Sequence, residues 1–167
     1  LAFGAIGDGT TNCATAIYRA LRKGAMVNVP VGVFYAPTQV DGITHGAGLR
    51  GVKRPTVNRT NNTFDSGSGS IIKALLGFNN VNDITIERLG VDSSPAPVLE
   101  GIVIQNFNGV NVEDVTIIGS DENNHCALIQ AGRNLVVRNC ITYGGKQGFA
   151  IKAIGFEVDG ITSHDTT

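Results

Sequence analysis

The sequence predicts an all-β chain that folds as a parallel β-helix, with one α-helix near the N-terminus. Three observations favour this fold class. The chain has 22 glycines in 167 residues and only 16% charged residues, a composition typical of β-structure with many tight turns. One pattern of apolar residues repeats four times in the second half of the chain. A helical pattern occurs near the N-terminus, and short strand patterns follow it.

The helical pattern begins at Thr11. Its apolar stripe, at spacings of three and four, consists of Ala14, Ile17, Tyr18 and Leu21. Thr11 or Asn12 is expected at the N-cap, where a side-chain oxygen accepts from free amides of the first turn. Arg22 and Lys23 fit the last turn, and Gly24 fits a left-handed stop. The segment AMVNVPVGVFYAP (25–37) is then predicted as extended strand with a Pro-Val-Gly turn.

The repeat places apolar or small residues at positions i, i+2, i+5 and i+7. Its four blocks are Ile84, Ile86, Leu89, Val91; Val110, Val112, Val115, Ile117; Leu135, Val137, Cys140, Thr142; and Phe156, Val158, Ile161, Ser163. A spacing of two indicates a strand with alternate side chains inward, and the extra residue before i+5 turns the chain. A further strand is predicted within 101–105, 126–130 and 148–152. Three short strands per coil of roughly 20 to 26 residues predict coils stacked about 4.8 Å apart.

Other classes fit less well. A β-sandwich needs hairpin turns, and only Asn108-Gly109 and Asp159-Gly160 offer candidates between strands. The net charge of −1 gives no electrostatic basis for binding nucleic acid or an anionic membrane. No apolar run approaches the roughly 20 residues of a membrane span. The scattered Cys13, Cys126 and Cys140 are predicted to be small buried residues rather than a disulfide or zinc framework.

The segment FGAIGDGTTNCATAIYRAL (3–21), followed by VNVPVGVFYA (27–36), resembles the start of the pectate-lyase-like β-helix superfamily. The resemblance implies a right-handed, single-stranded parallel β-helix with an N-terminal capping helix. It divides the chain into a cap, residues 1–36, and coils, residues 37–167, which are expected to continue in a longer polypeptide. Asn12-Cys13 stands where the family usually has Asp-Asp, and an Asn can still cap the helix.

The cap interpretation gives the glycine-rich loop a structural role. The end of a solenoid exposes strand edges and an apolar cross-section, and an amphipathic helix can cover them. Gly7 and Gly9 are expected to shape the loop, and Asp8 to accept hydrogen bonds from its backbone amides. A nucleotide loop is not indicated, because the Gly-Lys-Ser/Thr of a phosphate-binding loop is missing.

The superfamily includes polysaccharide lyases, polygalacturonase-like hydrolases, alginate epimerases and phage tailspikes. The resemblance therefore implies a polysaccharide partner, an extracellular or virion location and, for tailspike-like members, a homotrimer. The first hypothesis is a tailspike-like protein that recognises and cleaves a polysaccharide by hydrolysis or lyase chemistry. The alternatives are a non-catalytic structural or glycan-binding shaft of a virion appendage, and a secreted pectinase-like enzyme. No polygalacturonase or epimerase signature is present, so no active site is assigned.

Candidate site residues follow from the repeat. Gln105, Gln130 and Lys152 are predicted to form an outward stripe that binds sugar hydroxyls. The loops 92–100, 120–126 and 143–148 occupy equivalent places in successive coils, and such loops often gather on one binding face. They supply four weak catalytic candidates and two substrate-binding candidates: Asp92, Asp121, Glu122 and His125; Tyr143 and Lys146.

Two acidic groups in the repeat have other interpretations. Asp121 and Glu122 are possible calcium ligands, although two carboxylates without a ligand pattern are a weak signal. No other cofactor is expected. A column at i+3 contains Glu87, Glu113, Arg138 and Asp159. With Arg88 and Arg138 nearby, this column is predicted to hold ion pairs rather than a general acid.

Overall fold

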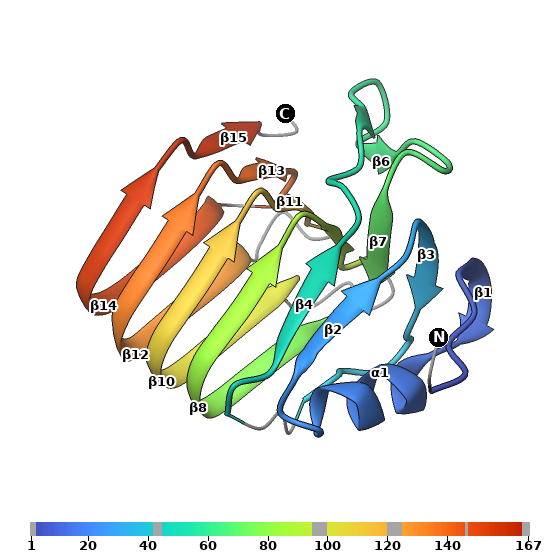
Figure 1. Ribbon diagram of the computed structural model, residues 1–167. Coiled ribbons are helices and arrows are strands. Elements are labelled where there is room, and N and C mark those ends of the chain that lie inside the picture. The colour runs from blue at the N-terminus through green and yellow to red at the C-terminus, as the bar shows by residue number, and fades with distance from the viewer. Residues whose placement is uncertain (1–2, 42–44, 95–99, 120–124, 146, 165–167) are drawn as a thin grey trace.

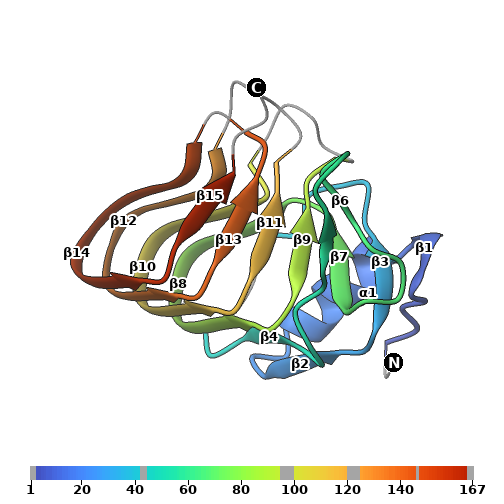
Figure 2. The same cartoon turned by 90° about the horizontal axis from the view of Figure 1, so that it is seen from above.

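The computed structural model describes residues 3–41, 45–94, 100–119, 125–145 and 147–164. The chain forms a solenoid of about six turns, built from two parallel sheets. One sheet has seven strands in the order β1 (Asp8–Asn12), β3 (Gly32–Tyr35), β7 (Ser70–Lys73), β9 (Gly90–Asp92), β11 (Thr116–Ile118), β13 (Ile141–Tyr143) and β15 (Thr162–His164). Figure 2 shows these strands side by side.

The other sheet has six strands, visible in sequence across Figure 1. In order they are β2 (Met26–Val29), β4 (Gly48–Gly51), β8 (Leu76–Glu87), β10 (Ile102–Glu113), β12 (His125–Arg138) and β14 (Gln147–Asp159). The helix α1 (Ala14–Leu21) lies at the β1–β2 end of the stack (Figure 1). It is too short to cross a membrane, and the described residues contain no helix that could.

The strand register confirms the predicted repeat. Val110 lies opposite Ile84 on one side and Leu135 on the other, and Leu135 lies opposite Phe156. The predicted inward residues are buried throughout the first three blocks. In the fourth block, Phe156 and Val158 are 57% and 41% exposed, because β14 is the last strand of its sheet and only one of its edges is paired.

The four coils that contain the long strands differ from the prediction in one respect. The two strands expected before the turn form one continuous bent strand of 12 to 14 residues in β8, β10, β12 and β14. Asn108-Gly109 lies at the bend of β10, where Gly109 has a φ of 78°, and is a corner rather than a hairpin. Asp159-Gly160 forms the corner between β14 and β15. The parallel pairing continues on both sides of the bend in the long strands, with a register shift at Gln130–Gly132 between β12 and β14.

Left-handed residues make the corners. The extra residue predicted between i+2 and i+5 has a φ between 50° and 63° in every block, at Arg88, Asp114, Asn139 and Gly160. The left-handed residue shifts the inward–outward alternation of side chains by one position, so the next strand begins with an inward side chain. Asn, Asp and Gly tolerate it best, and they fill three of these four positions.

The N-terminal loop has the predicted hydrogen bonds. The Asp8 carboxylate accepts from the amides of Thr10 and Thr11 at 2.9 and 2.7 Å and from the Thr11 hydroxyl at 2.6 Å. These bonds favour the charged form, so they hold the pKa of Asp8 well below its usual value. Gly7 has no room for a side chain, since a Cβ there would lie 2.9 Å from the Phe34 ring. Gly9 has a φ of 78°.

The N-cap of the helix lies one or two residues later than predicted. Residues Asp8–Asn12 form β1, and Cys13 occupies the N-cap with no side-chain cap bond of its own. Asn12 nevertheless satisfies a free amide, because its Oδ1 accepts from the Ala14 N–H at 2.9 Å. Gly24 has the expected positive φ, at 64°. The buried residues Ile17, Ala20 and Leu21 face the core at this end of the stack.

An excursion between β4 and β7 was not predicted. Residues 52–69 leave the coil, and within them β5 (Val57–Asn58) and β6 (Thr63–Phe64) form a small antiparallel pair. The Phe64 and Pro55 side chains pack so closely over Gly90 that a Cβ there would lie 2.6 Å from each. Arg54 reaches later coils: its Nη1 lies 2.9 Å from Asp114 Oδ1 and donates to the Asn139 carbonyl at 2.7 Å.

All three cysteines are free and buried, as the sequence predicted. Burial raises the pKa of the Cys140 thiol to about 11, which leaves it protonated and unreactive at neutral pH.

Candidate functional site

A polar ladder runs across the outer face of the long strands. Gln105 of β10 lies opposite Asn79 of β8 and Gln130 of β12, and Gln130 lies opposite Lys152 of β14. The inward neighbours Phe78, Ile104 and Ile129 are buried. Since side chains alternate along a strand, the ladder residues point away from the core. Their spacing is that of adjacent strands, about 4.8 Å.

A groove of about 430 Å³ lies over the first half of this ladder. Its walls are Gln39 and Asp41, which follow β3, and its floor includes Gly77, Val103, Asn79 and Gln105. Gly77 lets Gln39 lie close to the floor, since a Cβ at Gly77 would lie 2.5 Å from Gln39 Nε2 and would displace that side chain. Gln39 and Asp41 were not among the predicted site residues. They belong to a segment outside the repeat, so the register gave no signal for them.

A second groove, of about 610 Å³, follows the bend of the long strands. Half of its lining residues are amides and cations, namely Asn82, Asn106, Asn108, Arg133 and Lys152. The other half are Phe107, Ala131, Gly132, Ala153 and Ile154. The amides are ordered by one another, because Asn106 Nδ2 donates to Asn79 Oδ1 at 2.9 Å and Asn134 Nδ2 donates to Asn108 Oδ1 at 2.8 Å. Asn79 lines the first groove and Lys152 the second, so the ladder connects the two grooves.

Two of the loop-side candidates, Asp92 and Tyr143, lie on the other sheet. Asp92 ends β9 and forms an ion pair with Lys73 of β7, with 3.7 Å between Nζ and Oδ2. Ile118 of β11 lies between Asp92 and Tyr143 in the register, so those two candidates are two strands apart. Tyr143 is 5% exposed and stacks on His164 with a centroid distance of 4.8 Å.

His125, at the start of β12, lies beside Glu100. Its Nδ1 is 3.8 Å from Glu100 Oε1, and this buried nitrogen has no hydrogen-bond partner among the described residues. Asp121, Glu122 and Lys146 lie outside the described residues, so their proposed convergence with His125 stays a prediction. Within the described ranges, no cluster of three His, Cys, Asp or Glu side chains could hold a metal ion.

The acidic column contains ion pairs, as predicted. Glu87 pairs with Arg50 and with Arg88, the latter at 3.4 Å. Arg138 pairs with Glu157 at 2.6 Å rather than with its column neighbours, and this partner raises the pKa of the guanidinium further. The Glu87 and Glu157 carboxylates are thus both held by guanidinium groups in ion pairs.

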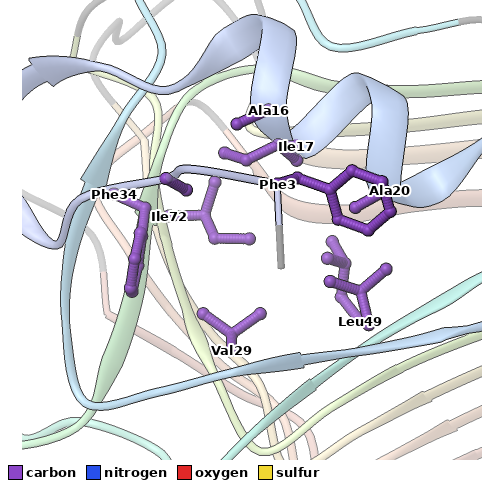
Figure 3. A pocket seen from close by; sticks show the side chains of 10 residues that line it. Phe3, Ala16, Ile17, Ala20, Val29, Phe34, Leu49 and Ile72 are labelled. Atoms are coloured by element: carbon purple, nitrogen blue, oxygen red, sulfur yellow. The ribbon is translucent and has the colours of Figure 1, made fainter. Parts of the chain in front are cut away.

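An apolar cavity of about 40 Å³ lies between α1 and the first coil (Figure 3). Phe3, Ile17 and Ala20 lie on its helix side, and Val29, Phe34, Leu49 and Ile72 lie on its coil side. Every side chain that lines it is apolar, so it offers no group for acid–base chemistry or for orienting a polar substrate.

Comparisons with known proteins agree on the fold. No protein-family model and no curated protein matches the chain. Three solved structures resemble it: a Geobacillus virus E2 protein, ORF18 (14% identity, TM-score 0.66); a putative glycosyl hydrolase from Parabacteroides merdae (11%, 0.62); and PfbA, a surface adhesin of Streptococcus pneumoniae (18%, 0.54). The alignments cover 96%, 97% and 86% of this chain, in that order.

The matched proteins differ in length. This chain spans 40% of the virus protein and 38% of the adhesin, but 93% of the hydrolase chain. At identities below 20%, the likeness establishes a shared β-helical architecture.

Proposed function

We propose that this chain is the polysaccharide-recognising part of a β-helical cell-surface or virion protein. The observation that carries the proposal is the in-register ladder of Asn79, Gln105, Gln130 and Lys152 between two grooves. Side-chain amides donate and accept, and an ammonium group donates, so the ladder matches the hydroxyls of a sugar chain. The structural likeness to a surface adhesin and to a virus protein supports the β-helical fold. Through the fold, it also supports a location on a cell surface or a virion.

The proposal includes membership of the pectate-lyase-like superfamily, with right-handed winding and α1 as the cap of residues 1–36. It is supported by the Asp8 hydrogen bonds and by the burial of Ile17, Ala20 and Leu21 against the core. The implied homotrimer is a separate prediction, which light scattering of the full-length protein would test. A monomeric mass would contradict it without affecting glycan recognition.

Cleavage of the bound polysaccharide is the second candidate function, with Asp92, Asp121, Glu122 and His125 as its candidate residues. The Asp92 carboxylate forms an ion pair with the Lys73 ammonium, 3.7 Å away. This contact gives Asp92 a structural role, which favours recognition without cleavage. Calcium binding by Asp121 and Glu122 remains a prediction, which calorimetric titration with calcium chloride would test.

Binding and cleavage are separable by experiment. The protein is titrated with bacterial capsule, lipopolysaccharide O-antigen and pectin by calorimetry, and each mixture is assayed for released oligosaccharides and for the ultraviolet absorbance of unsaturated uronates. We expect saturable binding to one polysaccharide. Removing two amides in the double variant Gln105→Ala/Gln130→Ala costs about 1 kcal/mol each, which weakens that binding roughly thirtyfold.

The matched control is Asn28→Ala/Asn58→Ala, which removes two exposed amides from β2 and β5, away from both grooves. Its affinity should equal that of the unmodified protein. Equal losses in the two double variants, or no binding to any polysaccharide, would contradict the proposal. Product release would establish cleavage as well.

A further inference from the structure

The outer face of α1 carries a cationic groove at the opposite end of the solenoid from β14 and β15. The groove has a volume of about 720 Å³, and its lining consists of Phe3, Thr15, Tyr18, Arg19, Arg22 and Lys23. The three cations are exposed and lie in the last turn of α1 or directly after it.

No acidic residue lies near these cations in the sequence. Residues 9–40 contain no Asp or Glu, so the i, i+4 ion pairs usual on surface helices are impossible within α1. Among the described residues, no ion pair involves Arg19, Arg22 or Lys23. The helix dipole favours a cation in the last turn. It does not account for three cations around one groove in a chain whose net charge is −1.

In the groove, one cation is held in place by an aromatic side chain, and a second aromatic side chain is exposed. Arg22 lies over the Tyr18 ring, 5.5 Å from its centroid, and its Nη1 donates to the Tyr18 hydroxyl at 3.1 Å. Phe3 is 41% exposed and lines both this groove and the apolar cavity under α1 (Figure 3). The guanidinium group of Arg22, held by Tyr18, therefore lines the same groove as the exposed ring of Phe3, which also borders the apolar cavity.

We propose that this face of α1 is a docking surface for an acidic polypeptide segment of a partner protein. Carboxylates of the partner bind Arg19 and Arg22, since guanidinium groups pair with carboxylates in a bidentate manner. An apolar side chain between those carboxylates packs on Phe3. A glycan fits less well, because Arg22 already covers the Tyr18 ring face on which a sugar would stack. The surface is independent of the polar ladder on β8, β10, β12 and β14.

Fluorescence anisotropy tests the proposal on the full chain. The probe is a labelled synthetic peptide of repeated Asp-Glu-Leu, and a Lys-Lys-Leu peptide and polygalacturonate serve as comparisons. We expect the acidic peptide to bind with an affinity that falls as salt is added. The variant Arg19→Ala/Arg22→Ala should weaken binding at least tenfold.

The matched control is Lys53→Ala/Arg59→Ala, which removes two exposed cations from the 52–69 excursion and changes the net charge equally. A second variant, Arg19→Ala/Lys23→Ala, keeps the Arg22–Tyr18 contact and so guards against a loss of folding. Binding lost in both Arg19 variants and kept in the control supports the surface. Equal losses in the control, no binding of the acidic peptide, or preferential binding of polygalacturonate at this face would overturn it.

Discussion

Ala131 has the side chain least suited to its corner. It has a φ of 59°, whereas the equivalent corner residues of the two preceding coils are Asn80 and Asn106. A left-handed conformation costs an L-residue with a Cβ roughly 1 to 2 kcal/mol, and glycine avoids this cost. Ala131, like Arg88, is therefore a position of the repeat where glycine should improve stability.

We predict that Ala131→Gly raises the free energy of unfolding by about 1 kcal/mol, as measured by urea denaturation. Ala150→Gly is the control, because Ala150 lies in β14 without a positive φ and should lose stability on the same change. Destabilisation by Ala131→Gly would show that the corner does not strain this residue.

Asp8 gives a prediction about pH. Its pKa is lowered in the folded protein, so its stabilising effect is complete above the ordinary aspartate value of about 3.9 and is lost as the pH falls toward the folded value. The melting temperature of the unmodified protein should therefore exceed that of Asp8→Asn at neutral pH, and the two should converge in acid. A gap that stays constant down to about pH 2 would mean that the charge of Asp8 contributes nothing.

For single residues, the sequence predicted the structure best where the residue type has one common backbone role. Asp8 was predicted to accept backbone hydrogen bonds, and Gly24 was predicted to end the helix; both predictions are confirmed. Gln39 was missed as a wall of the first groove. The position of Gln39 depends on the path by which the segment after β3 passes close to Gly77, and no local sequence pattern predicts that path.

The excursion of residues 52–69 acts as a strap across three coils. Arg54 contacts Asp114 and the Asn139 carbonyl, which are corner residues of successive blocks. Pro55 and Phe64 pack over Gly90 of β9. The strap therefore connects the fourth strand of the chain to corners far along the solenoid.

Arg54→Ala should lower the free energy of unfolding by about 1 kcal/mol, because one half-exposed ion pair and one charged hydrogen bond are lost. The measurement is thermal or urea unfolding, with Arg59→Ala of the same excursion as the control. Equal stability of the two variants would mean that the strap is held by its apolar contacts alone.

The elements were predictable to the extent that they repeat. Strands at equivalent positions in successive coils carry the same spacing, so each block corroborates the next. The bend joining two predicted strands into one was not foreseen, because left-handed residues interrupt the alternation there while the strand pairing resumes beyond the bend. The β5–β6 excursion occurs once, so it had no repeat to identify it.

For the whole molecule, the stack is one continuous apolar column. Ile117 is 0% exposed within it, with Val91 and Thr142 opposite on the neighbouring strands. Ile117→Asp buries an unpaired charge, which costs several kcal/mol, and should prevent folding or abolish cooperative unfolding in circular dichroism. Ile117→Val is the control and should cost about 1 kcal/mol. An Ile117→Asp protein of normal stability would contradict the inward register.

The sequence predicted the candidate functional site less well than it predicted the stacked apolar core. The stripe of Gln105, Gln130 and Lys152 was found because register alone places it. The loops were expected to converge, and this stays a prediction, because Asp121, Glu122 and Lys146 lie outside the described residues. Of the described candidates, Asp92 and Tyr143 lie two strands apart, and each has its own partner. Loop paths depend on packing between coils, which the sequence period does not specify.

The matched registers of β8, β10 and β12 also bear on how such a gene can change. Recombination between the DNA stretches for neighbouring coils would remove or duplicate about 25 residues and still bring equivalent residues into register at the junction. Descendants of one ancestor could thus differ in length by whole coils while retaining the same helix at one end. Variation of this kind would lengthen or shorten the polar ladder one rung at a time, and with it the stretch of polymer that the surface spans.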